Sequence, residues 1–163
     1  SLKTEEFIYV AKCDTSRLKE LAFHIHEALT FNQSLPDYLQ IKGAEEYYMI
    51  DYSDFKQQVL YGHTKNKALA HIILDDMKEV VCYRIEGTAQ QLQENDLPVE
   101  ELIQVNEGLS DDIRLVHKDQ NLNYIKNNAD QDQYLIGETS NSDKIALVFN
   151  EQGKYKGYTI INK

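Results

Sequence analysis

The sequence predicts an α+β fold, in which a mostly antiparallel sheet packs against a few helices. Short runs rich in Val, Ile, Leu and Tyr recur along the 163 residues, as strands do, and turn-forming residues separate them. Residues 16–30 differ, because their apolar side chains repeat with the spacing of one helix face. Two pairs of neighbouring runs are joined by short hairpin-like loops, which favours antiparallel pairing over a wound parallel sheet.

In the first half of the chain, two helices and four strands are predicted. The helix over residues 16–30 has Ser16 as a capping side chain, and Pro36 lies just beyond its end. A second helix is predicted to begin at Ser53 and to end near Gly62. The predicted strands cover residues 7–10, 47–50, 68–74 and 80–85.

In the second half, three short helices are predicted to alternate with four strands. Residues 88–95 form the first helix, and Pro98 opens the next, because proline suits the first turn of a helix. A weak, polar helix is predicted over residues 121–128. Gly153 supplies the positive φ that the last hairpin loop requires. The predicted strands cover residues 113–116, 134–136, 145–149 and 155–161.

The 163 residues fit a single compact domain, within which the order of elements suggests an internal duplication. Strand, helix, strand and hairpin occur in residues 5–87 and again in residues 111–163, as two related β-α-β-β units. A helical connector, residues 88–110, would join them. Because Tyr-, Ile- and Val-rich strands often match by chance, a single unrepeated domain stays the alternative. The short matches pair residues 10–12 with 116–118, 48–50 with 134–136, and 83–85 with 158–160.

Charge and composition argue against several classes of function. The net charge of −10 repels phosphate backbones and anionic membranes, and the longest basic cluster is residues 65–67. The chain shows no apolar run of the length that a secretory signal or a membrane span needs. Cys13 and Cys82 do not form a disulfide framework or a CxxC motif. We therefore expect a cytoplasmic protein that binds neither nucleic acid nor membranes.

No sequence motif predicts a catalytic or metal-binding residue. The nucleophile elbow, the phosphate-binding loops and the usual zinc-ligand pairs are all missing from the sequence. His24 and His26 lie two residues apart in the predicted helix, so they point to different flanks and cannot hold one ion together. An enzyme with dispersed residues stays an alternative, with Cys13 near one of these histidines, or His71 with Tyr83 on adjacent strands.

The tyrosines suggest a binding surface. The chain has 11 Tyr and no Trp, and tyrosine is amphipathic enough for half-buried strand faces, pocket rims and interfaces. The predicted function is a non-catalytic regulatory or binding module for a small molecule or a protein partner, with homodimerisation left open and no cofactor assigned. An acidic inhibitor or immunity-type protein that masks a basic partner is a further alternative. The candidate ligand-binding residues are Tyr48, His71, Tyr83, Tyr134 and Tyr158.

Overall fold

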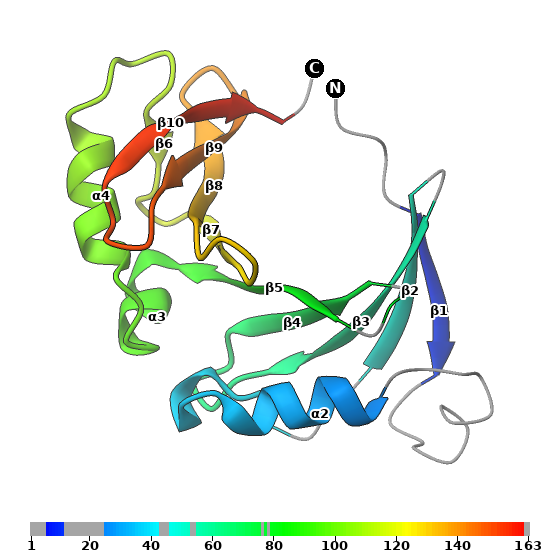
Figure 1. Ribbon diagram of the computed structural model, residues 1–163. Helices are drawn as coiled ribbons and strands as arrows, with labels where there is room; N and C mark the ends of the chain where they lie inside the picture. The colour runs from blue at the N-terminus through cyan, green and yellow to red at the C-terminus, as the bar shows by residue number, and fades with distance from the viewer. Residues whose placement is uncertain are drawn as a thin grey trace. The chain divides into compact units, whose positions relative to one another are not determined.

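The computed structural model describes residues 6–11, 25–42, 46–52, 55–75, 77 and 79–161. Within these residues the chain combines antiparallel strands with short helices, which confirms the predicted α+β class (Figure 1). The chain divides into two compact units, an N-terminal one that ends at Arg84 and a C-terminal one that begins at Ile85.

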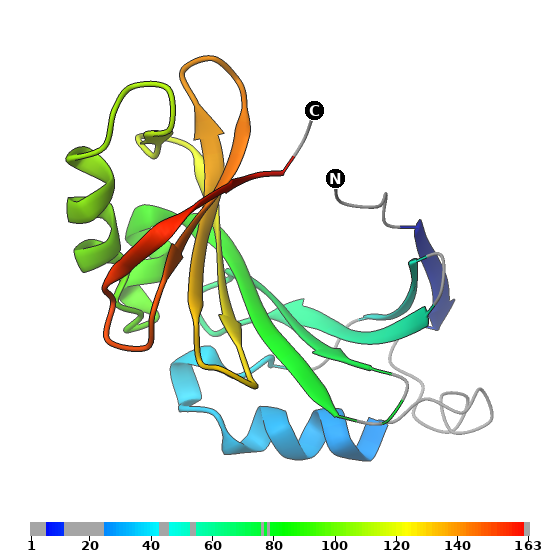
Figure 2. The same ribbon diagram turned by 45° about the horizontal axis from the view of Figure 1, so that its top comes forward.

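The N-terminal unit is an antiparallel meander covered by one helix. Its strands follow the order β1-β2-β3-β4-β5, and the pairs β1–β2, β2–β3 and β3–β4 are antiparallel. Helix α2 packs against β4 and lies along one face of this sheet (Figure 2). The elements are β1 (Glu6–Ala11), α2 (Ile25–Ser34), the 3-10 helix η1 (Asp37–Leu39), β2 (Glu46–Tyr52), β3 (Phe55–His63), β4 (Leu69–Leu74) and β5 (Val80–Thr88).

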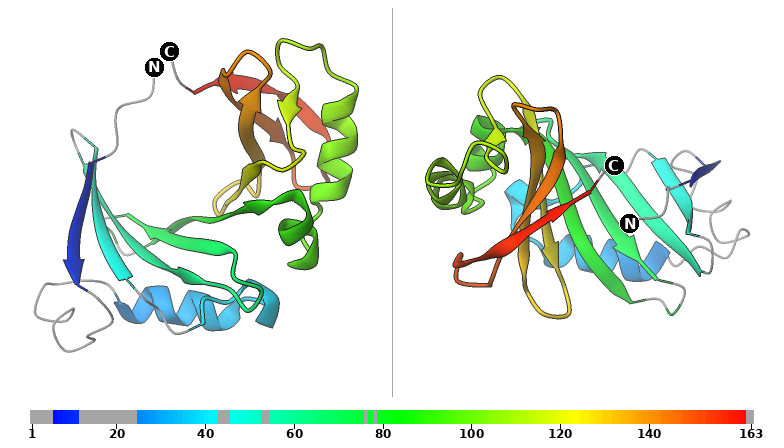
Figure 3. Two further views of the ribbon diagram at one scale, coloured as in Figure 1. Left: turned by 180° about the vertical axis from the view of Figure 1, so that it is seen from behind. Right: turned by 90° about the horizontal axis from the view of Figure 1, so that it is seen from above.

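The C-terminal unit is a second set of antiparallel strands, with two helices. Its strands follow the order β5-β7-β8-β9-β10, and β6 pairs with β8 off this path. Helix α3 packs against β7, and α4 lies beside the strands of the same unit (Figure 3). Its further elements are α3 (Ala89–Glu94), α4 (Val99–Glu107), β6 (Leu115–Val116), β7 (Asn121–Asn127), β8 (Gln133–Thr139), β9 (Lys144–Phe149) and β10 (Tyr155–Ile160).

Each unit buries its own aliphatic core between helices and sheet. The buried side chains alternate along β5, β7 and β8, as expected for strands with one face turned to the helices. The core of the N-terminal unit includes Ala28, Ile41, Leu60, Ile72 and Leu74. The core of the C-terminal unit includes Leu92, Val99, Leu102, Leu122, Leu135, Ile145, Leu147 and Phe149.

Strand β5 passes directly into helix α3 through a reciprocal cap. Thr88 Oγ1 accepts a hydrogen bond from the Gln91 backbone N at 3.2 Å, and Gln91 Oε1 accepts one from the Thr88 backbone N at 3.1 Å. A Cβ atom on Gly87 would lie 2.9 Å from Gln91 Oε1, so a glycine leaves room for this cap. The helix predicted for residues 88–95 is therefore confirmed, with Thr88 as the residue that starts it.

Two of the predicted helices are wrong, because both segments are strands. The segment from Ser53 to Gly62 contains β3, in which Val59 and Leu60 are each 1% exposed. Burial on both faces of β3 replaces the alternation expected of a strand, and the sequence then resembles a helix. Residues 121–128 contain β7, whose buried residues alternate with polar ones that obscure the period of two.

The remaining elements agree with the sequence, with shifted ends. Helix α2 ends at Ser34 rather than at residue 30, and β6 covers two residues rather than four. The predicted start of that first helix lies outside the described residues, as do Cys13 and His24. The last hairpin loop has Gly153 at φ +83°, which confirms the positive φ expected there.

The same buried hydrogen-bond pair occurs in both units. Asn32 Nδ2 donates to the carbonyl oxygen of Ile41 at 3.0 Å, and Asn32 Oδ1 accepts from the Ile41 backbone N at 2.8 Å. Asn106 makes the same two bonds to Leu115, at 2.9 and 2.7 Å. Both asparagines lie near the end of a helix and nine residues before their partner, and they are 74 residues apart. We call this arrangement the asparagine clamp.

The hairpin loops also recur at almost the same separation. The backbone N of Thr64 donates to the carbonyl of Ala68, and that of Thr139 donates to Asp143, both at 2.9 Å. In the next hairpin, an Asp75 carboxylate oxygen and the Asn150 amide oxygen each accept from the backbone N atoms two and four residues later. The two members of each pair are 75 residues apart, so the resemblance between the units extends from helix to hairpins.

Substitution of a clamp asparagine is predicted to destabilise the fold strongly. In Asn106→Ala, a buried N–H and a buried carbonyl of Leu115 lose their partners, and we expect the free energy of unfolding to fall by about 3 kcal/mol. Urea denaturation of this variant and of Asn128→Ala tests the prediction. Asn128 is exposed, so that control should change stability by less than about 0.5 kcal/mol. Equal effects of the two changes would contradict the structural role of the clamp.

Candidate functional site

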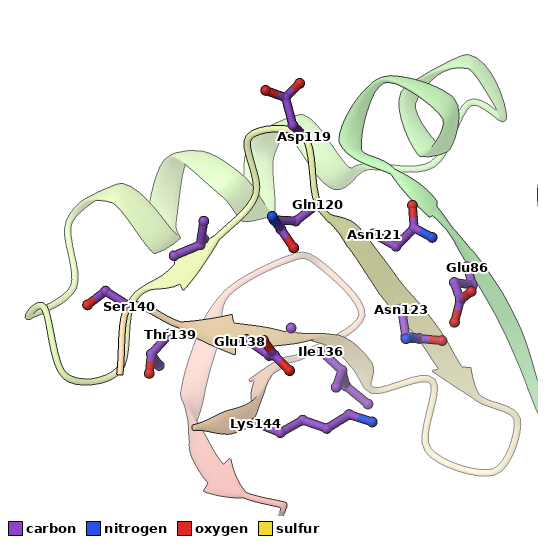
Figure 4. Close-up of a pocket in the computed structure, with 12 residues that line it drawn as sticks. Glu86, Asp119, Gln120, Asn121, Asn123, Ile136, Glu138, Thr139, Ser140 and Lys144 are labelled. Atoms are coloured by element: carbon purple, nitrogen blue, oxygen red, sulfur yellow. The ribbon is translucent and has the colours of Figure 1, made fainter. Parts of the chain in front are cut away.

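A polar groove of about 740 Å³ lies on the C-terminal unit (Figure 4). Its floor is the face of β8 that carries Ile136 and Glu138. The intervening Gly137 faces the core, because a Cβ atom there would lie 2.8 Å from Leu122 Cδ2. The groove is lined by Glu86, Val116, Asp119, Gln120, Asn121, Asn123, Ile136, Gly137, Glu138, Thr139, Ser140 and Lys144.

The strand register determines which lining side chains are neighbours. Glu138 is paired with Val116 of β6 on one side and with Lys144 of β9 on the other. Ile136 is paired with Asn123 of β7. Directly paired residues of antiparallel strands have Cβ atoms about 5 Å apart, so these side chains form two adjacent rows across the groove.

The loop between β6 and β7 forms one wall of the groove and is attached to helix α4. His117 Nε2 lies 2.6 Å from Glu107 Oε1, which joins the start of this loop to the end of the helix. Asp119 has φ +57°, a left-handed conformation that aspartate tolerates better than most residues, and it turns the chain into β7. The groove therefore has Gln120 on one side of its sheet floor, whereas the Asp119 carboxylate lies at its rim and is directed away from the other labelled side chains (Figure 4).

The groove carries more negative than positive charge. Its lining contains three carboxylates, on Glu86, Asp119 and Glu138, and one ammonium group, on Lys144. The side-chain amides of Gln120, Asn121 and Asn123 add hydrogen-bond acceptors and donors. Guanidinium and ammonium groups form their strongest hydrogen bonds with carboxylates, so this lining suits a cationic ligand.

The same lining offers no recognisable catalytic pair. Thr139 and Ser140 bring hydroxyl groups to the groove, but none of the lining residues is a histidine or a cysteine. Thr139 Oγ1 instead lies 3.3 Å from the backbone N atoms of Asn141 and Asp143 and accepts from them in the β8–β9 turn. Activation of a hydroxyl nucleophile requires a base within hydrogen-bond reach, and the described hydrogen bonds of Thr139 Oγ1 are to backbone N atoms instead.

The five residues predicted from the sequence lie outside the lining of this groove. Tyr83 is 5% exposed and donates its hydroxyl to the carbonyl of Leu39 at 2.8 Å, so it holds η1 against the sheet, and burial raises its pKa. Tyr48 is a backbone partner of Tyr9 and Val59. The side chain of Tyr48 lies outside the described part of the structure, and no described hydrogen bond or ring contact joins any two of the other four predicted residues.

Tyr134 and Tyr158 belong to the C-terminal unit but do not share a face of its sheet. Tyr134 is paired with Val148 of β9, and Tyr158 with Leu147 of the same strand. Because successive residues of a strand point to opposite faces, the two tyrosine side chains do so as well. Tyr134 is half-buried, whereas Tyr158 is 48% exposed.

His71 occupies an apolar, aromatic environment on β4. Its ring centroid lies 4.9 Å from that of Tyr61, and its Nδ1 atom is buried with no hydrogen-bond partner among the described residues. Burial, and to a smaller extent the nearby charge of Arg84, lower the pKa of His71 to about 4. The contacts of His71 and of Tyr83 involve different partners, Tyr61 and Leu39, so these contacts do not assemble the catalytic pair considered from the sequence.

Comparisons with known proteins identify no relative. No protein-family model matches the sequence, and neither a curated protein nor a solved structure does so. Across the ranges that the structure describes, no cluster of three or more His, Cys, Asp or Glu side chains could hold a metal ion. Within the same ranges, no helix combines the length and the apolar character needed to cross a membrane. The groove must therefore be interpreted from its own geometry.

The lowered pKa of His71 predicts a loss of stability in mild acid. Between pH 6.5 and about 4, the unfolded chain binds a proton that the folded chain does not, so unfolding becomes easier as the pH falls. The His71 contribution to this loss should approach about 3 kcal/mol at pH 4. Urea denaturation at several pH values between 7.5 and 4 tests this prediction. Over that range, the free energy of unfolding should fall less in His71→Phe than in the parent chain. His117→Gln is the control, and a similar acid response in all three chains would contradict the prediction.

Proposed function

We propose that this chain is a non-catalytic binding module, built from two versions of one structural unit, whose acidic groove binds a basic segment of a partner protein. The observation that carries the proposal is the groove itself, with three carboxylates and several amides around one ammonium group. A pocket for a small apolar molecule would be lined mainly by hydrophobic side chains, whereas Val116 and Ile136 are the large apolar residues here. The polar lining thus favours a cationic protein segment over such a molecule.

The recurring hydrogen bonds support the two-unit part of this proposal. A shift of 74 to 75 residues relates the asparagine clamps and both hairpin loops, and it also relates residues 83–85 to residues 158–160. The other short matches considered in the sequence do not fit this shift. The strand orders β1-β2-β3-β4-β5 and β5-β7-β8-β9-β10 correspond, so we infer that β5 ends the first version and begins the second. Residues 88–110 are then part of the second version rather than a connector.

Three positions of the groove differ in charge from the corresponding positions of the first version. At the shift of 74 to 75 residues, Glu138 corresponds to His63, Ser140 to Lys65 and Val116 to Lys42. In the N-terminal unit, both lysines interact with Asp37, whose pKa is lowered mainly by its hydrogen bond to Lys42. The shared backbone plan therefore does not require a carboxylate at position 138, which supports a role for Glu138 in binding.

The net charge of the chain is consistent with a basic partner. A charge of −10 would attract such a partner over long range and raise the rate of association, especially at low ionic strength. An inhibitor or immunity-type protein is one form of this function, in which the basic segment belongs to the active surface of the partner. A regulatory module that holds a basic segment of its own complex is the other form.

Peptide binding tests the groove. The probe is a fluorescent peptide of eight arginines, measured by anisotropy at low and at moderate salt. We expect Glu86→Gln/Asp119→Asn/Glu138→Gln to weaken binding roughly tenfold, since each lost carboxylate removes up to about 0.5 kcal/mol of attraction. The matched control Glu94→Gln/Glu100→Gln/Glu151→Gln removes the same charge from exposed positions outside the groove and should weaken binding less than about threefold. Equal losses in both variants, or no binding by the parent chain, would contradict the proposal.

A further inference from the structure

Strand β10 exposes residues whose counterparts in the first unit are buried. Tyr158 and Ile160 are 48% and 42% exposed. Their counterparts 75 residues earlier, Tyr83 and Ile85, are 5% and 0% exposed. The identities of the residues are the same at both pairs of positions, so the sequence of β10 is that of a covered strand, whereas its surroundings are those of an edge strand.

The strand order is one source of the difference, beside the packing of Tyr83 on η1. Strand β5 has a neighbour on each side, because β4 precedes it in the N-terminal unit and β7 follows it in the C-terminal unit. Among the residues that the structure describes, β10 is the last strand in the order, with β9 as its neighbour. The place that β7 holds beside β5 therefore has no counterpart beside β10 among the described strands.

We propose that β10 binds a second copy of this chain, by pairing with the β10 of that copy in an antiparallel, two-fold symmetric arrangement. This inference rests on the repeat described under the proposed function but not on the acidic groove. A two-fold pairing closes the assembly as a dimer, whereas attachment of β10 to the β1 edge of the next copy would continue without end.

The backbone of β10 is oriented for this pairing. Ile161 N donates to the carbonyl of Lys144 at 2.8 Å, so the polar backbone groups of Ile161, and of Thr159 two residues earlier, point toward β9. Those of Tyr158 and Ile160 then point to the open edge, where a second strand can bond with them. If the two-fold axis passes through the pair of Tyr158 residues, Tyr158 of one copy lies opposite Tyr158 of the other. Lys156 of each copy then lies opposite Ile160 of the other.

The charges on β10 permit two copies of an acidic protein to meet there. The strand YKGYTI contains one charged residue, Lys156, whose Nζ lies 2.6 Å from Asp132 Oδ2. The pairing described above sets no like charges opposite each other, since Lys156 faces Ile160. Many other surfaces of a chain with a net charge of −10 would repel a second copy more strongly.

Measurement of the molar mass of the full chain tests the interface. Light scattering with size-exclusion chromatography at about 100 μM should give twice the 18.9 kDa of the single chain, a complex of ordinary micromolar affinity. Ile160→Pro removes an N–H at the open edge and leaves the bonds to β9 in place, so it should give the single-chain mass. Met77→Lys changes a side chain that is 75% exposed in another part of the chain and should leave the dimer intact.

Disulfide trapping tests the register. The Cα atoms of Tyr158 and its symmetry mate would be about 5.5 Å apart, within the range of a disulfide, so oxidised Tyr158→Cys should form a covalent dimer. Thr159→Cys places the cysteine one residue away from the two-fold axis and should form far less covalent dimer. Three results would overturn the inference: the parent chain has the mass of a single chain, Ile160→Pro leaves the dimer unchanged, or the chain forms open-ended larger assemblies. The groove variants should keep the mass of the parent chain, so failure of the groove and failure of the interface are distinguishable.

Discussion

The asparagine clamp is the constraint on which both units depend. The side-chain amide of asparagine carries a donor NH₂ group and an acceptor oxygen, and each clamp uses both groups on a single residue that follows the helix. The helix end is thereby attached to the segment that enters the sheet, at a buried place where an unpaired polar group would be costly. In the C-terminal unit, the clamped Leu115 is paired with Thr139, and the next residue, Val116, is paired with Glu138. The clamp thus also sets the edge of the groove.

The sequence predicted the elements whose hydrophobic residues recur with a simple period. The predictions were wrong for a strand with both faces buried and for a strand rich in polar residues. Short apolar runs such as residues 69–74 and 144–149 were recognised because their turn residues and hairpin partners lie next to them. Strand β3 was mistaken for a helix because Val59 and Leu60 are both buried, which removes the alternation. The polar residues of β7 conceal the alternation of Leu122 and Tyr124, so its period of two was not recognised.

The candidate site was less predictable than the fold, because the register assembles it from distant residues. Glu86, Asp119 and Glu138 stand apart in the sequence among 27 acidic residues, and no local spacing distinguishes them. The alternation of β8 around Gly137 was the available signal, and it indicates a face rather than a groove. The number of tyrosines suggested a binding surface, yet the hydroxyl of Tyr83 donates a hydrogen bond to the carbonyl of Leu39 inside the fold. Residue type alone does not separate a tyrosine of the core from one of a binding surface.

The strand order ends at β1 and at β10, and β10 is the end where the exposure of the side chains is described. Natural edge strands commonly avoid association by bulges, inward-pointing charges or proline. Strand β10 has a bulge between Tyr155 and Gly157, and Gly157 has φ +138°, so its first residues depart from regular pairing. From Gly157 to Ile160 the pairing with β9 is regular again, without charge or proline. The protection therefore covers only the start of the strand, and the exposed tyrosine and isoleucine lie in the part that keeps the geometry needed for a further strand.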